Sequence, residues 1–289
     1  MVISSQLITL GLSMSNNVNF KAASLLLGAA MVFASPALSK AETRNHETRF
    51  SVKFAGIEIG QATFKIKFDD ESYSLKGTGK TAGLAEWFST STGEVSSSGD
   101  LIENTLKPKE HYAAVTEKKK KTESVKMSFS EDKVSEVSYQ TNKPRKEKKA
   151  PRYVPVEAKH LARVLDPASS LIIPMSGEDA RDGRKVCNQN FPIYDGETRY
   201  NIRLSFKHTK PIRTDGYNGH AYVCQMRYVP VAGHKIDHRT VQEMAKSKKM
   251  EIWLAPMGGV SVFTPIKILV PTKYGRFSAV PTRFSLVGS

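Results

Sequence analysis

RFSVKFAGIEIGQATFKIKF, residues 49–68, alternates apolar and polar side chains with a period of two. Such alternation is typical of a β-strand that buries one face and exposes the other. A turn at residues 55–57 interrupts the pattern, with Gly56 supplying the conformational freedom that a tight turn needs. The apolar positions on its two sides are Phe50, Val52 and Phe54, then Ala62, Phe64, Ile66 and Phe68. This stretch therefore predicts an antiparallel hairpin with one apolar face.

The same period continues along most of the chain. Asp195-Gly196, between two extended runs, is a strong signal for a hairpin turn. We expect further strands at residues 73–79, 94–99, 111–116, 122–129, 134–139, 186–194, 198–206, 221–231, 251–255, 260–270 and 277–287. The predicted fold class is mainly β, with a single curled antiparallel sheet or an incomplete barrel and one or two short helices.

Three segments break the β pattern and predict helical structure. Residues 83–88 suit one helical turn. Residues 156–165 place apolar side chains at helical spacing and end before Asp166-Pro167, because proline disfavours helical geometry in the residue before it. A third candidate helix covers residues 241–249.

The N-terminus has the layout of a secretory signal peptide. Lys21 precedes an uncharged apolar run at residues 22–34, and small residues follow up to Ala41. The run has 13 residues, whereas a membrane-spanning helix needs about 20, which favours a cleaved signal over a retained anchor. We expect a signal peptide at residues 1–41, one β-rich periplasmic domain at residues 42–289, and a Gram-negative type of envelope.

Cys187 and Cys224 are the two cysteines of the chain. In an oxidising compartment, two such cysteines are more often paired than free. Their separation excludes a C-x-x-C redox motif, and two thiols without neighbouring ligands make a poor zinc site. We predict a structural disulfide between the hairpin around Asp195-Gly196 and the following strand; a reactive pair and a metal site stay open as alternatives.

The chain is strongly basic, with a formal net charge of +15 at pH 7. Much of the excess lies in two lysine tracts, residues 118–121 and 143–149. They are interpreted either as solvated loop tips or as weak contacts to an anionic membrane surface or another envelope polymer. The residues in question are Lys118, Lys119, Lys120, Lys121, Lys146, Lys148 and Lys149. Export argues against nucleic acid as a partner.

Several short motifs resemble the bacterial domain-of-unknown-function family numbered 3108. They are Gly56-Ile57 with Gly60, Leu165-Asp166, the block from Cys187 through Asp195-Gly196 to Tyr200, and Gly219-x-Ala221-x-x-Cys224 leading to residues 230–233. Together they span nearly all of the chain after the signal. The resemblance implies an exported, β-rich envelope protein without an established reaction. It also implies a general architecture similar to the curled sheets of periplasmic lipid and lipoprotein carriers.

No catalytic motif is legible in the sequence. His234 and His238 are four residues apart, but Gly233 precedes them and no glutamate follows His234 as a metalloprotease helix requires. A polar loop that enters a helix with Asp237 as its cap is the favoured interpretation. His160 and His220 have no recognisable nucleophile beside them, and a G-x-S-x-G motif is absent. We expect neither catalysis, nor a cofactor, nor a metal.

The expected function is non-catalytic support of cell-envelope integrity by a monomeric periplasmic protein. The leading hypothesis is binding of a lipid chain or an extended hydrophobic peptide in a groove of the curved sheet. A scaffolding protein without a small ligand is the alternative, and a hydrolase is the third. An apolar groove faced by Trp87, Phe88 or Trp253 favours binding, a filled interior favours scaffolding, and a cluster of His, acid and Ser in a cleft favours the hydrolase.

Overall fold

The structure is a computed structural model that describes residues 43–83, 86, 90–117, 121–142, 152–175, 177–258 and 262–287. Ala41–Ser289 form one compact unit. The predicted signal peptide, residues 1–41, lies outside the described residues. The predicted helical turn at residues 83–88 is described only at Gly83 and Glu86, so this prediction stays untested.

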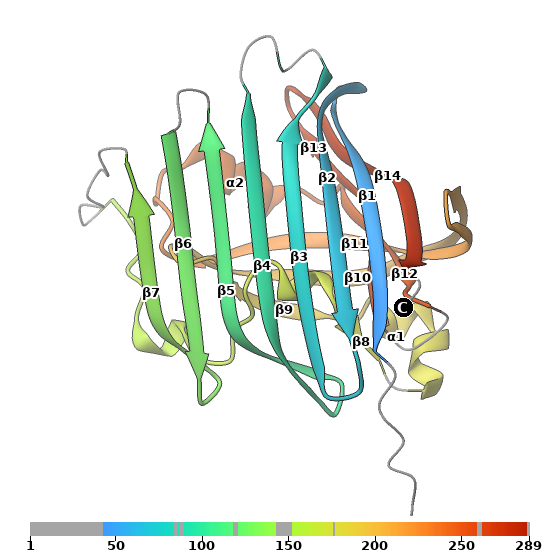
Figure 1. The fold of residues 1–289 in the computed structure, drawn as a ribbon. Helices are drawn as coiled ribbons and strands as arrows, with labels where there is room; N and C mark the ends of the chain where they lie inside the picture. The colour runs from blue at the N-terminus through green and yellow to red at the C-terminus, as the bar shows by residue number, and fades with distance from the viewer. Residues whose placement is uncertain are drawn as a thin grey trace, which may run out of the picture. The chain divides into compact units, whose positions relative to one another are not determined.

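The described strands form one antiparallel sheet, in the order β7-β6-β5-β4-β3-β2-β1-β14-β13-β12-β11-β10-β9 (Figure 1). The first seven are β1 (Arg44–Phe54), β2 (Ile57–Phe68), β3 (Ser72–Thr81), β4 (Ser91–Ile102), β5 (Thr105–Glu117), β6 (Lys121–Ser130) and β7 (Lys133–Thr141). The others are β9 (Asn190–Tyr194), β10 (Arg199–Thr214), β11 (Tyr217–Ala232), β12 (Met250–Pro256), β13 (Val262–Thr272) and β14 (Gly275–Val287); the short β8 (Ile173–Pro174) pairs with β13.

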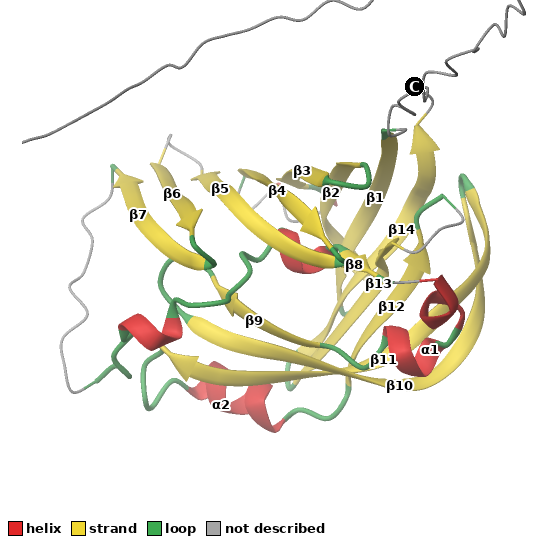
Figure 2. Cartoon of the chain, turned by 90° about the horizontal axis from the view of Figure 1, so that it is seen from below, coloured by secondary structure: helices red, strands yellow, loops and turns green. Residues whose placement is uncertain are grey.

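The sheet curls until its two ends approach each other without pairing. In Figure 2, β3–β7 and β9–β11 lie in opposite layers, and β1 and β14 join them on one side. The edge strands β7 and β9 are linked through the segment 161–165. Leu161 O accepts from Val134 N (3.0 Å), and Leu165 N donates to Pro192 O (2.8 Å). The predicted fold class, mainly β with a curled antiparallel sheet that is not closed, is confirmed.

The core follows from the alternation seen in the sequence. Inward side chains of β2 and β3, including Ile66 and Leu75, pack with Ile172 and Phe284 in one cluster of buried apolar residues. A second cluster surrounds Cys187 and Cys224 and includes Leu204 and Leu254. Both clusters take residues from the 168–187 segment, so this segment fills part of the space that the sheet encloses.

The prediction of a helix over residues 156–165 is wrong. Only the 3₁₀ turn η2 (Ala158–His160) forms there, and the chain then runs beside β7, with Ala162 bridged to Lys133. Arg163 adopts a positive φ of 52°, a conformation that a helix cannot continue. A helix does not form there despite the helical spacing of the apolar residues. The backbone groups of residues 161–165 instead make hydrogen bonds to the unpaired edges of β7 and β9.

Two strand boundaries differ from the sequence prediction. Residues 186–194 were expected to form one strand, but the segment begins as the helix α1 (Gly183–Val186), and β9 starts only at Asn190. Asp182 caps α1 by accepting from Arg184 N (2.9 Å). Residues 207–219, which lie between the strands expected at 198–206 and 221–231, are not a long loop. They are mostly strand, because β10 and β11 pair along nearly their whole length up to a turn at Asp215-Gly216.

The third predicted helix forms as α2 (Arg239–Lys246), outside the layer of β10 and β11 (Figure 2). Its N-cap is His238 and not the predicted Asp237, whose carboxylate instead pairs with Lys235 at 3.1 Å. Further 3₁₀ turns in the described part of the chain are η3 (Ser169–Leu171) and η4 (Gly177–Arg181). In the described part of the chain, no helix has the length and apolar character to cross a membrane.

Candidate functional site: an apolar cavity inside the curled sheet

A cavity of about 240 Å³ lies on the inner face of the curled sheet, over β1. It exists because two alanines flank β1 on its neighbouring strands. Ala62 of β2 pairs with Phe50, and Ala279 of β14 pairs with Val52. The lining consists of Thr48, Phe50, Val52, Ala62, Phe64, Ile66, Leu75, Leu171, Thr264, Pro265, Ile268 and Ala279. Among the described lining residues, the two threonines alone have polar side chains, so the cavity suits an apolar occupant.

Phe64 forms one wall, and its position depends on a glycine of the next strand. A Cβ at Gly77 would lie 2.7 Å from Phe64 Cε1 and 2.6 Å from Val95 Cγ1. The phenyl ring therefore lies over the backbone of β3. Its other side approaches Phe50, with ring centroids 6.1 Å apart in an edge-to-face arrangement. Gly77 thus keeps the ring out of the space that the cavity occupies.

Leu171 reaches the cavity from η3, and a buried polar cluster holds that turn in place. The cluster consists of Tyr73, Ser97, His111, Asp166 and Ser169, each at most 3 % exposed. Asp166 Oδ1 accepts from the backbone N–H groups of Ala168 and Ser169, both at 2.9 Å. These two bonds anchor the start of η3, which carries Leu171 to the cavity.

The side chains of the sheet complete the cluster around the Asp166 carboxylate. His111 Nδ1 lies 2.9 Å from Oδ1, and the Ser97 hydroxyl donates to Oδ2 at 2.8 Å. The Ser169 hydroxyl donates to Oδ2 at 2.5 Å and lies 2.7 Å from the Tyr73 hydroxyl. Burial, the largest influence, raises the pKa of Asp166. The hydrogen bond and charge of His111 together with the bonds from Ser169 outweigh it and hold this pKa below its usual value.

This cluster contains the residue types of a catalytic triad in a different order. In a triad the histidine stands between serine and acid, so that it can take the proton of the hydroxyl. Here the carboxylate of Asp166 stands in the middle, with His111 and the hydroxyls of Ser97 and Ser169 around it. The cluster lies in the packed interior and not in a cleft. Its arrangement fits the positioning of η3.

The sequence predicts an apolar groove in the curved sheet but not the residues that line it, and it does not predict the polar cluster. Leu165-Asp166 belongs there only to the family resemblance, and Asp166-Pro167 predicts a helix end. One local signal was available: Asp166 followed by Ser169 is the pattern of an aspartate that caps a turn. His111, Ser97 and Tyr73 carry no such signal, because they come from three other strands.

Trp253, the one expected aromatic side chain that the structure describes, does not line the cavity. Trp87 and Phe88 lie outside the described residues. Trp253 is buried elsewhere: its indole N–H donates to Glu251 at 3.3 Å, and Lys267 Nζ lies 4.4 Å from the ring centroid. The aromatic wall is formed instead by Phe50 and Phe64.

Cys187 and Cys224 are joined by a disulfide, with Cα atoms 5.5 Å apart and both side chains fully buried. Cys224 lies on β11 as predicted. Cys187 is the C-cap of α1 and not part of the β9–β10 hairpin, which corrects the predicted position. The bridge therefore ties the 168–187 segment to the sheet.

Most lysines proposed for anionic contacts cannot be placed. Lys118, Lys119, Lys120, Lys146, Lys148 and Lys149 lie outside the described residues. Lys121 is the first residue of β6, and its side chain is not described. Among the described residues, no three side chains of His, Cys, Asp or Glu come together as metal ligands would.

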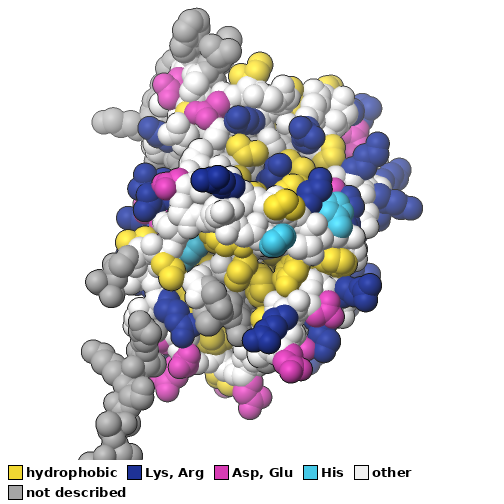
Figure 3. All heavy atoms as spheres, turned by 90° about the vertical axis from the view of Figure 1, so that its right-hand side faces the viewer, with side chains coloured by type: hydrophobic (Ala, Val, Ile, Leu, Met, Phe, Trp, Pro, Cys, Tyr) yellow, Lys and Arg dark blue, Asp and Glu magenta, His cyan; other side chains and the backbone are white. Residues whose placement is uncertain are grey.

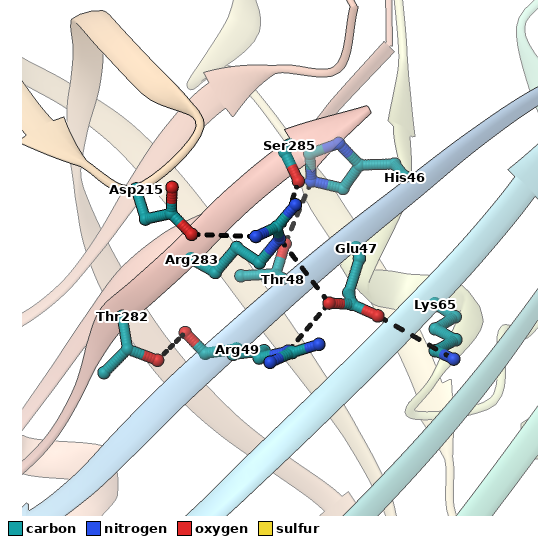
Figure 4. Close-up of polar contacts among 9 residues, drawn as sticks. All are labelled: His46, Glu47, Thr48, Arg49, Lys65, Asp215, Thr282, Arg283 and Ser285. Atoms are coloured by element: carbon teal, nitrogen blue, oxygen red, sulfur yellow. Dashed lines mark hydrogen bonds and ion pairs between the residues drawn. The ribbon is translucent and has the colours of Figure 1, made fainter. Parts of the chain in front are cut away.

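An ion network surrounds Glu47 of β1 (Figure 4). Glu47 alternates along the strand with Thr48, which lines the cavity, so the network lies on the opposite face of β1. Glu47 contacts Arg49 at 2.7 Å and Lys65 at 3.7 Å. Arg283 of β14 lies 3.7 Å from the same carboxylate and 2.8 Å from Asp215 in the β10–β11 turn. Because Asp215 O also accepts from the backbone N–H of residue 284 (2.8 Å), the network fastens this turn onto β14. Its arrangement fits a structural role.

Comparisons with known proteins place the chain in a family but assign it no activity. One solved structure that it is similar to is a "Beta-barrel-like Protein of Domain of Unknown Function DUF1849 from Brucella abortus", with 8 % sequence identity and a TM-score of 0.49. The similarity covers 86 % of this chain and 100 % of that one. No curated protein matches the chain. The family described as "Protein of unknown function (DUF3108)" matches residues 49–280, and the chain therefore belongs to the DUF3108 family.

Proposed function

We propose that this protein binds the acyl chain of a lipid in the cavity over β1, as a non-catalytic protein of the bacterial periplasm that supports the cell envelope. The observation that carries the proposal is the cavity itself, about 240 Å³ in volume and lined almost entirely by apolar side chains. With such a lining, the cavity favours an apolar ligand, because removing apolar side chains from water against apolar groups is favourable. Its volume is below the range of about 300–1,000 Å³ for drug-sized ligands, which suits one chain segment and not a whole lipid.

The lining favours an acyl chain over an extended peptide. A buried peptide needs hydrogen-bond partners for its backbone amides, and an unpaired amide costs about 1–3 kcal/mol. Of the lining residues that the structure describes, only Thr48 and Thr264 supply a side-chain hydroxyl, and Thr48 already contacts His46 Nε2 at 3.0 Å. An acyl chain has no amide groups and needs no hydrogen-bond partners in the cavity.

Periplasmic location is part of this proposal. It is supported by the signal-like N-terminus and by the disulfide of Cys187 and Cys224, since disulfides persist in oxidising compartments. The non-catalytic role is supported by the buried cluster around Asp166, whose order differs from that of a catalytic relay.

A fluorescent fatty acid such as cis-parinaric acid tests chain binding. Ala62→Leu and Ala279→Leu each add side-chain volume to the cavity, so both variants should lose most of the probe's fluorescence gain while keeping the parent fold. Gln61→Leu is the matched control, because this neighbour of Ala62 is exposed and does not line the cavity. Native mass spectrometry of protein purified from a periplasm, with lipid extraction, should detect a bound lipid.

Equal probe binding by the parent and both cavity variants would overturn the site. A parent protein that binds no probe and carries no lipid would favour the alternative, a scaffolding role without a small ligand.

A further inference from the structure

Two turns lie side by side at one end of the sheet. The β1–β2 turn at Ala55-Gly56 contacts the β13–β14 turn, since Ala55 N donates to Arg276 O at 3.0 Å. The ring of Phe54 lies 4.6 Å from that of Phe277, centroid to centroid. We call residues 53–58 and 273–277 the docking rim.

The docking rim exposes large apolar side chains. Tyr274 is 77 % exposed, Ile57 53 % and Phe277 42 %. Single exposed apolar residues are common on soluble proteins, whereas several that come together mark an interaction site. The pairing of Phe54 with Phe277 and the contact between the turns bring these residues into one surface.

Positive charges accompany these apolar side chains. The docking rim contains Lys53, Lys273 and Arg276 against one acid, Glu58. Lys273 Nζ lies 4.6 Å from the ring centroid of Tyr274 and 3.1 Å from Glu243 of α2. The carboxylate of Glu58 accepts from the hydroxyl of Ser51. Figure 3 shows one face of the molecule, the side to the right in Figure 1, where hydrophobic side chains lie among Lys and Arg.

The docking rim is continuous with the cavity. Side chains two residues apart on a strand point to the same face. Phe54 follows Val52 at this spacing on β1, and Phe277 precedes Ala279 on β14; Val52 and Ala279 both line the cavity. The aromatic pair therefore stands between the cavity and the exposed end of the two hairpins.

We infer that the docking rim binds the surface of a lipid bilayer with anionic headgroups and so places the cavity next to the acyl chains. Tyr274, Phe277 and Ile57 enter the interfacial layer, where amphipathic aromatic side chains are favoured. Lys53, Lys273 and Arg276 face the negative surface. The inference that docking delivers an acyl chain to the cavity rests on the proposed function. Binding of the docking rim to a bilayer can be measured separately.

The combination of residues favours a bilayer over a protein partner. A layer of anionic headgroups presents negative charge next to apolar acyl chains. The docking rim presents positive charge next to exposed apolar side chains, so the two surfaces are complementary. An interface with a second copy of the chain would place the like charges of two docking rims opposite each other, which is unfavourable.

Co-sedimentation with vesicles tests the inference on the mature protein. Vesicles of phosphatidylethanolamine with phosphatidylglycerol should bind it, and vesicles of phosphatidylcholine alone should bind it less. The variant with Lys273→Gln and Arg276→Gln should lose about 30-fold in vesicle affinity, the loss expected from removing two cations near an anionic surface. The variant with Tyr274→Ser and Phe277→Ser should lose binding to both kinds of vesicle. Ile102→Ser is the control, because Ile102 is 53 % exposed at the opposite end of the sheet.

Two further measurements separate docking from chain binding. Both docking-rim variants should bind cis-parinaric acid as the parent does in solution without vesicles, which also shows that they fold. The Ala62→Leu variant should no longer bind cis-parinaric acid but should bind vesicles as the parent does. Docking is overturned if both docking-rim variants bind anionic vesicles like the parent. It is also overturned if the parent binds no anionic vesicles. A dimer in sedimentation velocity that the docking-rim variants abolish would then assign this surface to a second copy of the chain. If the parent binds vesicles but does not bind cis-parinaric acid, the proposed function is overturned and docking is not.

Discussion

His111 Nδ1 lies 2.9 Å from Asp166 Oδ1, with both side chains buried, although the two residues are far apart in the sequence. The pair joins β5 to the turn that carries Leu171 into the cavity. Because both side chains are buried, removing Asp166 would leave His111 and the hydroxyls of Ser97 and Ser169 without this acceptor in the interior, which is costly.

Asp166→Asn should therefore lower the free energy of unfolding by about 1–3 kcal/mol, the usual loss when buried hydrogen-bonding groups are left without a partner. Asp100→Asn is the control: its exposed pair with Lys109, 2.7 Å apart, should contribute about 0–1 kcal/mol. Urea unfolding at pH 7 measures both. Because the pKa of Asp166 is held below its ordinary value in the folded state, its contribution is present above that value and is lost as the pH falls through the folded pKa. Equal losses in the two variants would contradict the structural role of the cluster.

His46 should make stability pH-dependent in a second window. Burial lowers its pKa from 6.5 to about 4, against the charge of Glu47, which raises it. The unfolded state binds the proton first, so the free energy of unfolding should fall as the pH drops from 6.5 to 4, by about 3 kcal/mol. His46→Gln should remove this part of the pH dependence, while His208→Gln, at an exposed position, should keep it. Thermal unfolding from pH 7 to pH 4 compares the variants, and parallel curves for all three would refute the assignment.

Gly77→Ala should destabilise the protein by about 1–3 kcal/mol, the range for overpacking, because its Cβ would collide with Phe64 and Val95. It should also weaken probe binding, since the displaced Phe64 ring lines the cavity. Gly79→Ala on the same strand is the matched control: its nearest neighbour would be Gln61 O at 3.7 Å, an ordinary contact. Calorimetry and the probe titration should separate the two variants. Equal behaviour of both would show that Phe64 is not held by Gly77.

The disulfide should be complete in the mature protein, with no titratable thiol until denaturation in reductant. Replacing Cys187 and Cys224 together by serine should cost about 2–5 kcal/mol of stability, the usual range for a native disulfide. Chain binding per folded molecule should stay unchanged, because neither cysteine lines the cavity. Two free thiols in the native protein, or an unchanged melting temperature of the variant, would reopen the reactive and metal-binding alternatives.

The lysine tract at residues 118–121 should add a salt-sensitive share to binding of anionic vesicles. Replacing its four lysines by glutamine should lower this binding most at low salt, because salt screens exposed charges. A control that removes the same net charge replaces Lys67, Lys76, Lys133 and Lys159, all exposed elsewhere on the chain. Equal binding of both variants in a vesicle titration would leave the tract as a solubilising loop.

The sequence by itself determined the fold class, because a period of two is a local property that any single strand displays. Residues 49–68 form β1 and β2 as predicted, and Asp195-Gly196 forms the expected turn, in which Asp195 Oδ1 accepts from the backbone N–H groups of residues 197 and 198. The family could also be named from short motifs spread along the chain. Each of these signals lies within one segment.

Tertiary structure alone decided where the sheet stops and what it encloses. Residues 156–165 have helical spacing, but they pair with the edges of β7 and β9, whose unpaired backbone groups can be satisfied there only after the sheet has curled. The cavity arises because Ala62 and Ala279 meet across β1, and the polar cluster arises because Asp166 meets His111 and Ser97 from two other strands. Strand register and sheet curvature determine these contacts. Neither can be predicted from the local apolar and polar pattern of a single segment.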